Sequence, residues 1–298
     1  YKDYVFEGIK LERPVKVIVD GGNGAGGPYL PEILRRLGCE VTEMYCEPDG
    51  TFPNHHPDPT VEKYMTDLID AVKNSDAEVG LGLDGDADRI GVVDEKGKML
   101  FGDQILTILA RDFLKANPGE KIIGDVKCSK NFFDDIAKHG GIPIMYKTGH
   151  ANIKSKMQRD GLLMSGEMSG HVFLKDRFLG FDDAIYVCAR FVEIMSKTDM
   201  PVSEYLADQP KMYNTPEIHF KSTDDDKFDL VAKVRDSFIA EGYNVNTIDG
   251  MRITFEDGWG LCRASNTTPV LVLRFEAETE ERLIEIQKLI EDRIEELK

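Results

Sequence analysis

The stretch VKVIVDGGNGAGGPYLPEILRRLG, residues 15–38, predicts the fold class of this chain. Its first part, VKVIVD, is typical of a buried strand, GGNGAGG is typical of a tight turn, and PYLPEILRRLG predicts a helix that ends at Gly38. A strand followed by a tight turn and a helix is the first half of a βαβ unit, so the stretch indicates an α/β domain.

The same order of elements occurs a second time further along the chain. The first strand ends at Asp20 and its helix at Gly38, and a later strand ends at Asp125 and its helix at Gly140. In both copies the next strand ends in a similar way, with EMY or with IMY. This internal repeat predicts an α/β fold with two similar mixed-sheet domains of about 100 residues each.

The remaining residues predict a third domain of another kind. The runs MRITFEDG, WGLCRAS and PVLVLRFEAE alternate as antiparallel strands do, and TEERLIEIQKLIEDRIEELK has the pattern of an amphipathic helix. We therefore expect an α+β C-terminal domain with an antiparallel sheet. The predicted domains are residues 1–98, 99–210 and 211–298.

The composition argues against several kinds of partner. A net charge of −17 disfavours nucleic acid and anionic membranes as general partners, and it means that a site for an anionic substrate has to be a local group of basic residues. No apolar run reaches transmembrane length, and no signal peptide is visible. The five cysteines are scattered and form no CxxC pair, which indicates reduced thiols and a cytoplasmic protein.

The stretch GLDGDADRIG places three aspartates at every second position. These are Asp84, Asp86 and Asp88. In an extended segment alternate side chains point the same way, so the carboxylates are expected to converge on one hard cation such as Mg²⁺. A calcium loop counted from Asp84 has Glu95 at its twelfth position, but Arg89 replaces the glycine of the sixth position and the flanks read as strands. A solvated acidic turn is the simpler alternative, although an arginine beside three metal-bound aspartates makes sense if a phosphate also binds.

The glycine-rich turn has two interpretations. It matches the dinucleotide-binding pattern G-x-G-x-x-G at Gly22, Gly24 and Gly27, and Glu43 stands roughly where a ribose-binding acid belongs. A plain tight turn between a strand and a helix explains the same glycines, and we favour it because so many glycines match many patterns.

Polar residues also follow two strands of the second repeat. KTGH offers Lys147, Thr148 and His150, and Lys127 follows the preceding strand in DVKCS. Residues at the carboxyl ends of strands face the usual ligand crevice of an α/β sheet. The alternative for a lone lysine is a solvated surface position.

Two more loops are rich in hydrogen-bonding side chains. GEMSGHVF contains Glu167, Ser169 and His171. CRASNTTP contains Arg263, Ser265, Asn266, Thr267 and Thr268. The alternating residues of the first loop suit the adjacent hydroxyls of a sugar, and the second loop suits a phosphate, because it combines an arginine with hydroxyls and free backbone N–H groups. The alternatives are an ordinary edge strand and a polar hairpin turn.

The motifs DGDADR, VKCS, KTGH, GEMSGHVF and RASNTTP, in this order, resemble the α-D-phosphohexomutase superfamily, and most of all its phosphomannomutase/phosphoglucomutase branch. The resemblance implies an isomerase of carbohydrate metabolism that converts hexose 1-phosphates and 6-phosphates into one another through a phosphoserine and a hexose 1,6-bisphosphate. It implies one Mg²⁺ per site and the bisphosphate as activator. Met168 favours hexose phosphates over the amino-sugar branches, whereas the residues do not distinguish glucose from mannose.

The resemblance also implies a role for each motif residue. The metal ligands would be Asp84, Asp86 and Asp88. The residues beside the reacting groups would be Arg89, Lys127 and His150. The substrate-binding residues would be Lys147, Thr148, Gly149, Glu167, Ser169, His171, Arg263, Ser265, Asn266 and Thr267. The last four would bind the phosphate that is not being transferred.

One element of the superfamily pattern is missing. The first domain of the superfamily carries its phosphoserine in a loop of the type T-[AS]-SHNP, and the nearest stretch here, PNHHPDP, has no serine. We therefore expect the chain to match domains two to four, to lack the N-terminal phosphoserine domain, and to be inactive alone; the start YKDYVF, without methionine, favours a fragment. The alternative function is a non-catalytic sugar-phosphate-binding protein, and a dehydrogenase is a more distant one.

Overall fold

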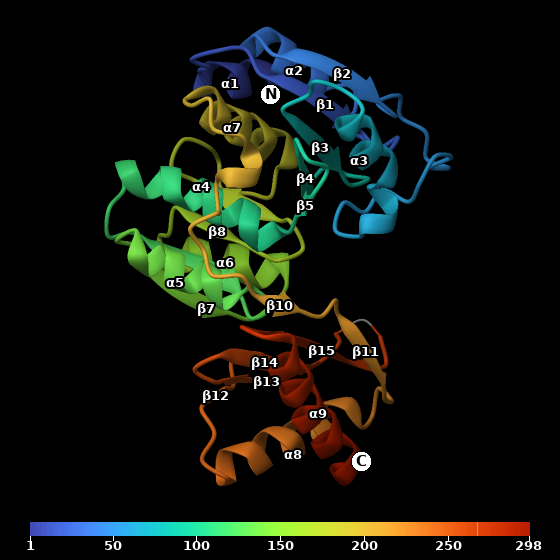
Figure 1. Ribbon diagram of the computed structural model, residues 1–298, viewed down its shortest axis with the longest axis vertical. Coiled ribbons are helices and arrows are strands. Elements are labelled where there is room, and N and C mark those ends of the chain that lie inside the picture. The colour runs from blue at the N-terminus through green and yellow to red at the C-terminus, as the bar shows by residue number, and fades with distance from the viewer. Residues whose placement is uncertain (267) are drawn as a thin grey trace. The chain divides into compact units, whose positions relative to one another are not determined.

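The computed structural model describes residues 1–266 and 268–298 (Figure 1). Thr267, one of the predicted phosphate-binding residues, lies outside the described residues. The chain divides into two compact units. The first consists of Tyr1–Gly124, Phe132–Ile144 and Gly149–Asp208. The second consists of Asp125–Asn131, Met145–Thr148 and Gln209–Lys298.

The N-terminal part of the first unit is built on a five-stranded sheet with the strand order β2-β1-β3-β4-β5. Its strands are β1 (Lys16–Asp20), β2 (Glu40–Met44), β3 (Val79–Leu83), β4 (Ile90–Asp94) and β5 (Met99–Leu100). Its helices are α1 (Lys2–Gly8), α2 (Leu30–Leu37), the 3₁₀ turn η1 (Glu62–Tyr64) and α3 (Thr66–Lys73). β1 runs parallel to β2 and β3, whereas β3, β4 and β5 are antiparallel, so the sheet is mixed.

A second sheet has four strands in the order β7-β6-β8-β9. Its strands are β6 (Lys121–Asp125), β7 (Ile142–Tyr146), β8 (Met164–Gly166) and β9 (Val172–Leu174). The helices of this part are α4 (Gly102–Ala116), α5 (Lys130–Lys138), α6 (His150–Asp160), α7 (Ala184–Ser196) and the 3₁₀ turn η2 (Val202–Glu204). The strand order repeats that of β2-β1-β3-β4, and β8 is again parallel to the central strand and antiparallel to its successor. The predicted pair of similar mixed-sheet domains is confirmed.

The C-terminal part of the chain forms an antiparallel sheet in the order β10-β15-β14-β13-β12, with β11 also paired to β15. Its strands are β10 (Tyr213–Asn214), β11 (Ile218–Lys221), β12 (Val245–Asn246), β13 (Met251–Thr254), β14 (Gly258–Ala264) and β15 (Val270–Ala277). The helices α8 (Lys227–Ala240) and α9 (Glu280–Leu297) pack on the sheet (Figure 1). Ile286, Ile290 and Ile294 of α9 are fully buried, as expected of the apolar stripe of an amphipathic helix. The predicted antiparallel α+β domain is confirmed.

An aspartate at the end of the central strand connects two loops in each repeat. Asp20 ends β1, and its carboxylate accepts a hydrogen bond from the N–H of Gly22 (2.8 Å) and lies 3.0 Å from Nε2 of His55. Asp125 ends β6, and its Oδ2 accepts a hydrogen bond from Oγ1 of Thr148 (3.0 Å). Cys128 Sγ also donates to Oδ1 of Asp125 (3.1 Å), so both aspartates connect the turn after the central strand to the loop after the neighbouring strand.

The Asp20–His55 pair makes the stability of the first unit depend on pH. The hydrogen bond to Asp20 raises the pKa of His55 from 6.5 to about 9. A histidine whose pKa is higher in the folded than in the unfolded protein stabilises the folded state. This stabilisation is fully present below the unfolded pKa of 6.5 and is lost as the pH rises through about 9. We expect His55→Asn to cost about 1–2 kcal/mol near pH 6 and almost nothing near pH 10; the figure is reduced because the ring is partly exposed. Urea unfolding at both pH values tests this, and equal losses would contradict it.

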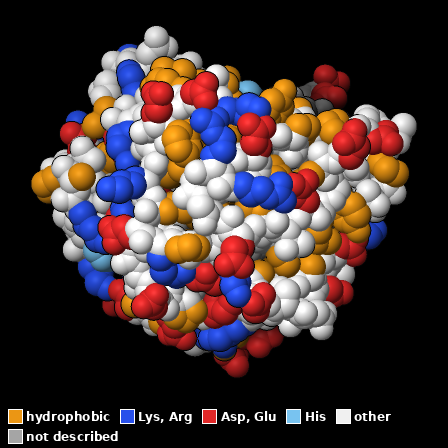
Figure 2. Space-filling model, turned by 90° about the horizontal axis from the view of Figure 1, so that it is seen from above, with side chains coloured by type: hydrophobic (Ala, Val, Ile, Leu, Met, Phe, Trp, Pro, Cys, Tyr) orange, Lys and Arg blue, Asp and Glu red, His pale blue; other side chains and the backbone are white. Residues whose placement is uncertain are grey.

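The surface is mixed in charge on the face that Figure 2 shows, where Lys and Arg side chains lie among Asp and Glu side chains and scattered hydrophobic ones. All five cysteines are buried free thiols. Over residues 1–266 and 268–298, no helix combines the length and the apolarity needed to cross a bilayer.

Candidate active site

The aspartate loop, DGDADR, joins β3 to β4 as a tight turn. The expectation of an extended segment is wrong. Ala87 has a left-handed backbone (φ 63°) and helps to reverse the chain direction. The carboxylates still converge: one oxygen from each of Asp84, Asp86 and Asp88 lies within 4.8 Å of the others. The buried Asp84 fixes the turn, since its Oδ1 accepts hydrogen bonds from the N–H groups of Asp88 (2.9 Å) and Arg89 (3.0 Å).

The electrostatics of this loop favour a divalent cation. Burial raises the pKa of Asp84 to about 6, although hydrogen bonds from Arg89 oppose the shift. Asp88 is affected in the opposite direction, because a hydrogen bond from His171 lowers its pKa to about 2. Three converging carboxylates repel one another, and oxygen donors are the ligands that Mg²⁺ prefers. The donor set therefore fits Mg²⁺.

Arg89 is held at the edge of the aspartate loop by two carboxylates. Its Nε donates to Oδ2 of Asp84 (2.8 Å), and its Nη1 donates to Oδ1 of Asp58 (3.1 Å). The arginine side chain is 25% exposed, so it remains accessible to an anion. Asp58 belongs to the PNHHPDP stretch, which has no sequence pattern that predicts a contact with this site.

The glycine-rich turn after β1 packs directly against the aspartate loop. The N–H of Ala25 donates to the carbonyl oxygen of Gly85 (2.9 Å). A Cβ added at Gly24 would lie 2.7 Å from that oxygen, and a Cβ added at Gly27 would lie 2.3 Å from the carbonyl oxygen of Cys46. Close backbone packing therefore accounts for these glycines, and a dinucleotide is not needed to explain them.

The GEMSGH loop joins β8 to β9, which is the place that the aspartate loop has in the first repeat. It too is a turn, so the alternative of an ordinary edge strand does not hold for residues 167–170. The two loops meet, because Arg89 and His171 form a backbone bridge and the N–H of Ile90 donates to the carbonyl oxygen of Gly170 (3.2 Å). The predicted metal loop and the predicted sugar loop, GEMSGH, are therefore in direct backbone contact.

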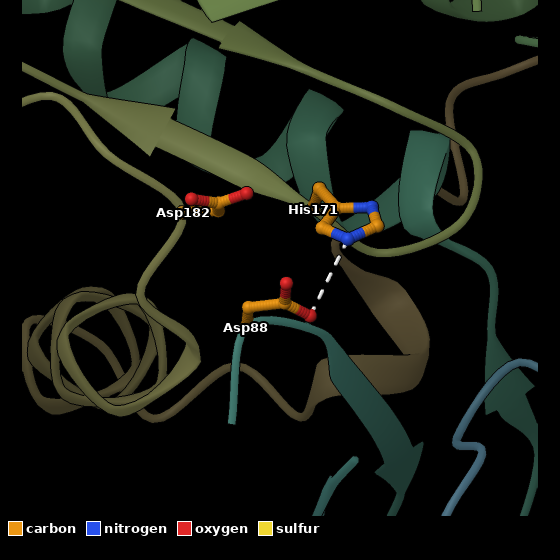
Figure 3. A group of neighbouring side chains, drawn as sticks. All are labelled: Asp88, His171 and Asp182. Carbon is orange, nitrogen blue, oxygen red and sulfur yellow. Dashed lines mark ion pairs between the residues drawn. The ribbon is translucent and has the colours of Figure 1, made fainter. Parts of the chain in front are cut away.

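His171 connects the two loops through its side chain. Its Nε2 lies 3.3 Å from Oδ1 of Asp88, an ion pair that Figure 3 marks with a dashed line. Its Nδ1 lies 2.8 Å from Oγ of Ser169 and 3.3 Å from Oε2 of Glu167. Burial alone would lower the pKa of His171, but the hydrogen bonds to Asp88 and Glu167 raise it to about 9. The ring is therefore a cation at neutral pH and a hydrogen-bond donor to its neighbours.

The KTGH motif contributes His150 as the first residue of α6. Its ring stacks on that of His171, with centroids 5.4 Å apart, and its Nδ1 lies 3.1 Å from Oδ2 of Asp182. The N–H of Gly149 donates to Oε1 of the buried Glu167 (2.6 Å). The start of α6 is thus attached to the sugar loop by a backbone hydrogen bond and by ring stacking.

Asp88, His171 and Asp182 form a second group whose donor atoms lie within 4.8 Å of one another (Figure 3). The charge of Asp182 is already matched, because its carboxylate accepts a hydrogen bond from Nζ of Lys154 (2.9 Å) and pairs with His150. A metal ion at this place would also have to displace a proton from His171, whose ring nitrogens pair with Asp88 and Glu167. The aspartate loop is therefore the better site for Mg²⁺.

The second unit holds the other predicted substrate residues, with Asp249 at their centre. Oδ2 of Asp249 accepts hydrogen bonds from Nε of Arg263 (2.9 Å) and from the N–H of Thr148 (3.0 Å). Oγ of Ser265 accepts a hydrogen bond from the N–H of Thr268 (3.2 Å), which closes the polar turn. The other described positions are an exposed Asn266 and a half-buried Lys147.

Lys127 lies in the same unit on the loop after β6. Its buried ammonium group donates to Oε1 of Glu217 (2.7 Å). Four carboxylates that hold the site residues were not predicted from the sequence. They are Asp58, Asp182, Glu217 and Asp249. The sequence offered one weak signal for them, the turn-forming dipeptide Asp-Gly at residues 249–250.

Solved structures define the class of fold first. A phosphoglucomutase/phosphomannomutase family protein from Burkholderia thailandensis superimposes with a TM-score of 0.94 at 42% identity, over 100% of this chain and 64% of that one. An N-acetylphosphoglucosamine mutase from Aspergillus fumigatus, described in complex with GlcNAc-6P and magnesium, has a TM-score of 0.69 at 18% identity, over 98% of this chain and 68% of that one, and shares the fold. The chain therefore has the fold of these sugar-phosphate mutases.

Sequence comparison then gives the family. Residues 2–97 match phosphoglucomutase/phosphomannomutase α/β/α domain II, residues 101–213 match α/β/α domain III, and residues 217–293 match the C-terminal domain. A phosphomannomutase/phosphoglucomutase of Pseudomonas putida is 49% identical over 94% of this chain and 60% of its own length. The chain belongs to the phosphoglucomutase/phosphomannomutase family, and it spans about 60% of the length of that relative.

Proposed function

We propose that the chain provides the metal, sugar and phosphate loops of a phosphohexomutase, which converts hexose 1-phosphates and 6-phosphates into one another. The observation that carries the proposal is the meeting of the aspartate loop with the sugar loop at His171. The phosphoserine would come from a segment outside the 298 residues, which contain no serine loop of the superfamily type. This segment is the remaining partner of the chain, and the small-molecule partners are hexose phosphates.

The first unit would hold the phosphoryl group that is transferred. Mg²⁺, bound by Asp84, Asp86 and Asp88, would neutralise charge on the phosphoryl oxygens. Arg89 would donate hydrogen bonds to the same group, because its planar guanidinium matches phosphate geometry. Phosphoryl transfer depends mostly on positioning and charge neutralisation, so a cation beside an accessible arginine is the expected arrangement.

The hexose would bind through its hydroxyls and its other phosphate. Its sugar hydroxyls would contact Glu167, Ser169 and His171 of the sugar loop. Its second phosphate would contact Arg263, Ser265, Asn266 and Thr267. Lys147, Thr148 and Gly149 would line the substrate from the KTGH loop.

The chemical step breaks the P–O bond of phosphoserine and forms a P–O bond to a sugar hydroxyl. The hydroxyl loses its proton in this step, and His150 would receive it, while the serine oxygen leaves with the electrons of the broken bond and takes up a proton. Lys127, whose ammonium group donates to Glu217, would neutralise charge on the phosphate. The product is a hexose 1,6-bisphosphate, which turns around and returns its other phosphoryl group to the serine, so the bisphosphate also serves as activator. Glucose and mannose phosphates are both candidate substrates, and the buried thiols support a cytoplasmic location.

The proposal predicts ligand binding without turnover for the 298-residue chain. Calorimetry is expected to detect Mg²⁺-dependent binding of glucose 1,6-bisphosphate, whereas a coupled assay with glucose 1-phosphate is expected to show no glucose 6-phosphate above background. The longer protein that carries the serine loop is expected to turn over both glucose and mannose 1-phosphates in the same assay.

The outcomes separate the proposed function from its alternatives. Turnover by the 298-residue chain alone would show that it contains a nucleophile of its own. A longer, phosphoserine-loaded protein that binds hexose phosphate without turnover would identify a non-catalytic binding protein and would refute the mutase.

A further inference from the structure

The PNHHPDP loop, residues 53–59, attaches the aspartate loop to the rest of the first unit. Nδ2 of Asn54 donates to Oδ1 of Asn23 in the glycine-rich turn (2.7 Å). The next residue, His55, bonds Asp20 at the end of β1 (3.0 Å). Asp58 then accepts the hydrogen bond from Arg89 (3.1 Å). The loop therefore contacts the glycine-rich turn, the end of β1 and the aspartate loop.

Asp58 is itself rigidly placed. Its Oδ1 accepts hydrogen bonds from both the N–H (3.1 Å) and Oγ1 (2.7 Å) of Thr60, and prolines precede and follow it in the sequence. Burial would raise the pKa of Asp58, but its bonds from Thr60 and its ion pair with Arg89 lower the pKa overall. An ionised and fixed carboxylate thus faces the guanidinium.

The two carboxylates that accept hydrogen bonds from Arg89 differ in their other contacts. Asp84 fixes the backbone of the aspartate loop and is one of the three residues whose oxygens converge for a cation. Asp58 is outside that group, so a cation bound by the loop does not compete for it. Because Asp58 bonds Nη1 and Asp84 bonds Nε, the two contacts together fix the plane of the guanidinium, which one contact cannot do.

We propose that Asp58 is a positioning residue, which fixes the plane of the Arg89 guanidinium for the phosphoryl group. The proposal rests on the proposed function for the identity of the anion, and on the geometry alone for the restraint of Arg89. It predicts a specific defect of Asp58 variants, in which Arg89 is free to rotate while the fold and the metal loop remain intact.

The chain offers a matched control for this proposal in Asp49. Oδ1 of Asp49 accepts hydrogen bonds from the N–H (2.9 Å) and Oγ1 (2.7 Å) of Thr51, which is the same turn that Asp58 forms with Thr60. Asp49 lies in the same irregular segment between β2 and α3 but is not an ion-pair partner of Arg89. Asp49→Asn and Asp58→Asn therefore make the same chemical change in equivalent turns, and only the second affects Arg89.

The test compares the two variants in the 298-residue chain. Nitrogen-15 NMR of the arginine side chains is expected to show that guanidinium rotation of Arg89 speeds up at least about tenfold in Asp58→Asn and is unchanged in Asp49→Asn. With saturating Mg²⁺, Asp58→Asn is expected to bind glucose 1,6-bisphosphate about tenfold more weakly, whereas Mg²⁺ binding stays within about twofold.

Equal Arg89 rotation in the two variants would overturn the proposal. Faster Arg89 rotation in Asp58→Asn but not in Asp49→Asn supports the positioning role of Asp58. If the chain without substitutions binds no bisphosphate, the proposed function is refuted, but the positioning role is not. An Asp58→Asn protein that loses Mg²⁺ binding or its folded NMR spectrum would show that Asp58 has a structural role, and would also overturn the proposal.

Discussion

Asp88→Asn is expected to weaken Mg²⁺ binding to the 298-residue chain by at least about 100-fold. Asp88 contributes one of the three converging carboxylates, and its pKa of about 2 keeps it ionised at neutral pH. Changes to residues that only support a ligand cost 10–100-fold in metal affinity in other proteins, so the loss of a ligand charge is expected to cost more. Titration calorimetry at neutral pH measures the change directly.

Asp88 and Asp86 are better test positions than Asp84. The carboxylate of Asp84 accepts two backbone hydrogen bonds and the bond from Arg89, so its replacement would disrupt the turn as well as the cation site. Asp70→Asn, an exposed carboxylate on α3, removes the same charge far from the loop in sequence and controls for the net charge. Unchanged Mg²⁺ affinity in both Asp86→Asn and Asp88→Asn would refute the aspartate loop as the metal site.

The internal repeat was the most informative feature of the sequence. A strand with a terminal aspartate, a turn and a helix recur at Asp20 and Asp125, and the two sheets have the same strand order for that reason. The aspartate loop and the GEMSGH loop also occupy the same β-hairpin position in their sheets, and the backbone bridge between Arg89 and His171 joins them. Local pattern and repeat therefore predict the fold and the loops that carry the candidate site.

The same reasoning could not predict which partners hold the site residues. Asp58 precedes Arg89 by 31 residues, and Asp249 follows Thr148 by 101, so these pairs exist only once the sheets have formed. The expectation that alternate side chains converge in an extended segment is wrong for a similar reason. Ala87 enters a left-handed conformation because the loop closes a tight β-hairpin, and no local propensity of alanine favours that state.

The second unit contains a buried charged cluster centred on Glu276 of β15. Oε1 of Glu276 accepts hydrogen bonds from Nε1 of Trp259 (2.8 Å), Oγ of Ser129 (2.9 Å) and the N–H of Lys130 (3.0 Å). Arg252 lies 3.7 Å from the centre of the Trp259 ring and is fully buried, and burial lowers its pKa to about 10. The negative charge of Glu276 thus acts favourably on the buried guanidinium of Arg252, and its hydrogen bonds to Ser129 and Lys130 hold the loop that follows β6.

This anchoring determines the position of a predicted site residue. Nη1 of Arg252 donates to the carbonyl oxygens of Val126 (2.6 Å) and Cys128 (2.8 Å), and Nη1 of Arg274 donates to the carbonyl oxygen of Lys127. The backbone on both sides of Lys127 is therefore fixed by arginines of the antiparallel sheet. A loss of the cluster is expected to release this loop as well as to destabilise the unit.

Glu276→Ala is expected to lower the free energy of unfolding of the second unit by about 3–5 kcal/mol. The change removes the acceptor that three donors share and also the negative charge that acts on the buried Arg252, and both buried donors and buried charges are costly to leave uncompensated. Trp259 is the only tryptophan of the chain, so its fluorescence in urea reports on this unit alone.

Two further variants show whether the loss arises from the buried acceptor. Glu276→Gln keeps an oxygen for Trp259 but loses the charge, so we expect a smaller loss of about 1–2 kcal/mol. Glu278→Ala removes an exposed carboxylate two residues along the chain and is expected to cost less than about 0.5 kcal/mol. Of these variants, only Glu276→Ala is expected to speed up hydrogen exchange of residues 126–130. The reason is that Arg252, Arg274 and Glu276 all form hydrogen bonds with the backbone of this segment. Equal stability of the Glu276 and Glu278 alanine variants would mean that the cluster does not stabilise the unit, and that the position of Lys127 depends on other contacts.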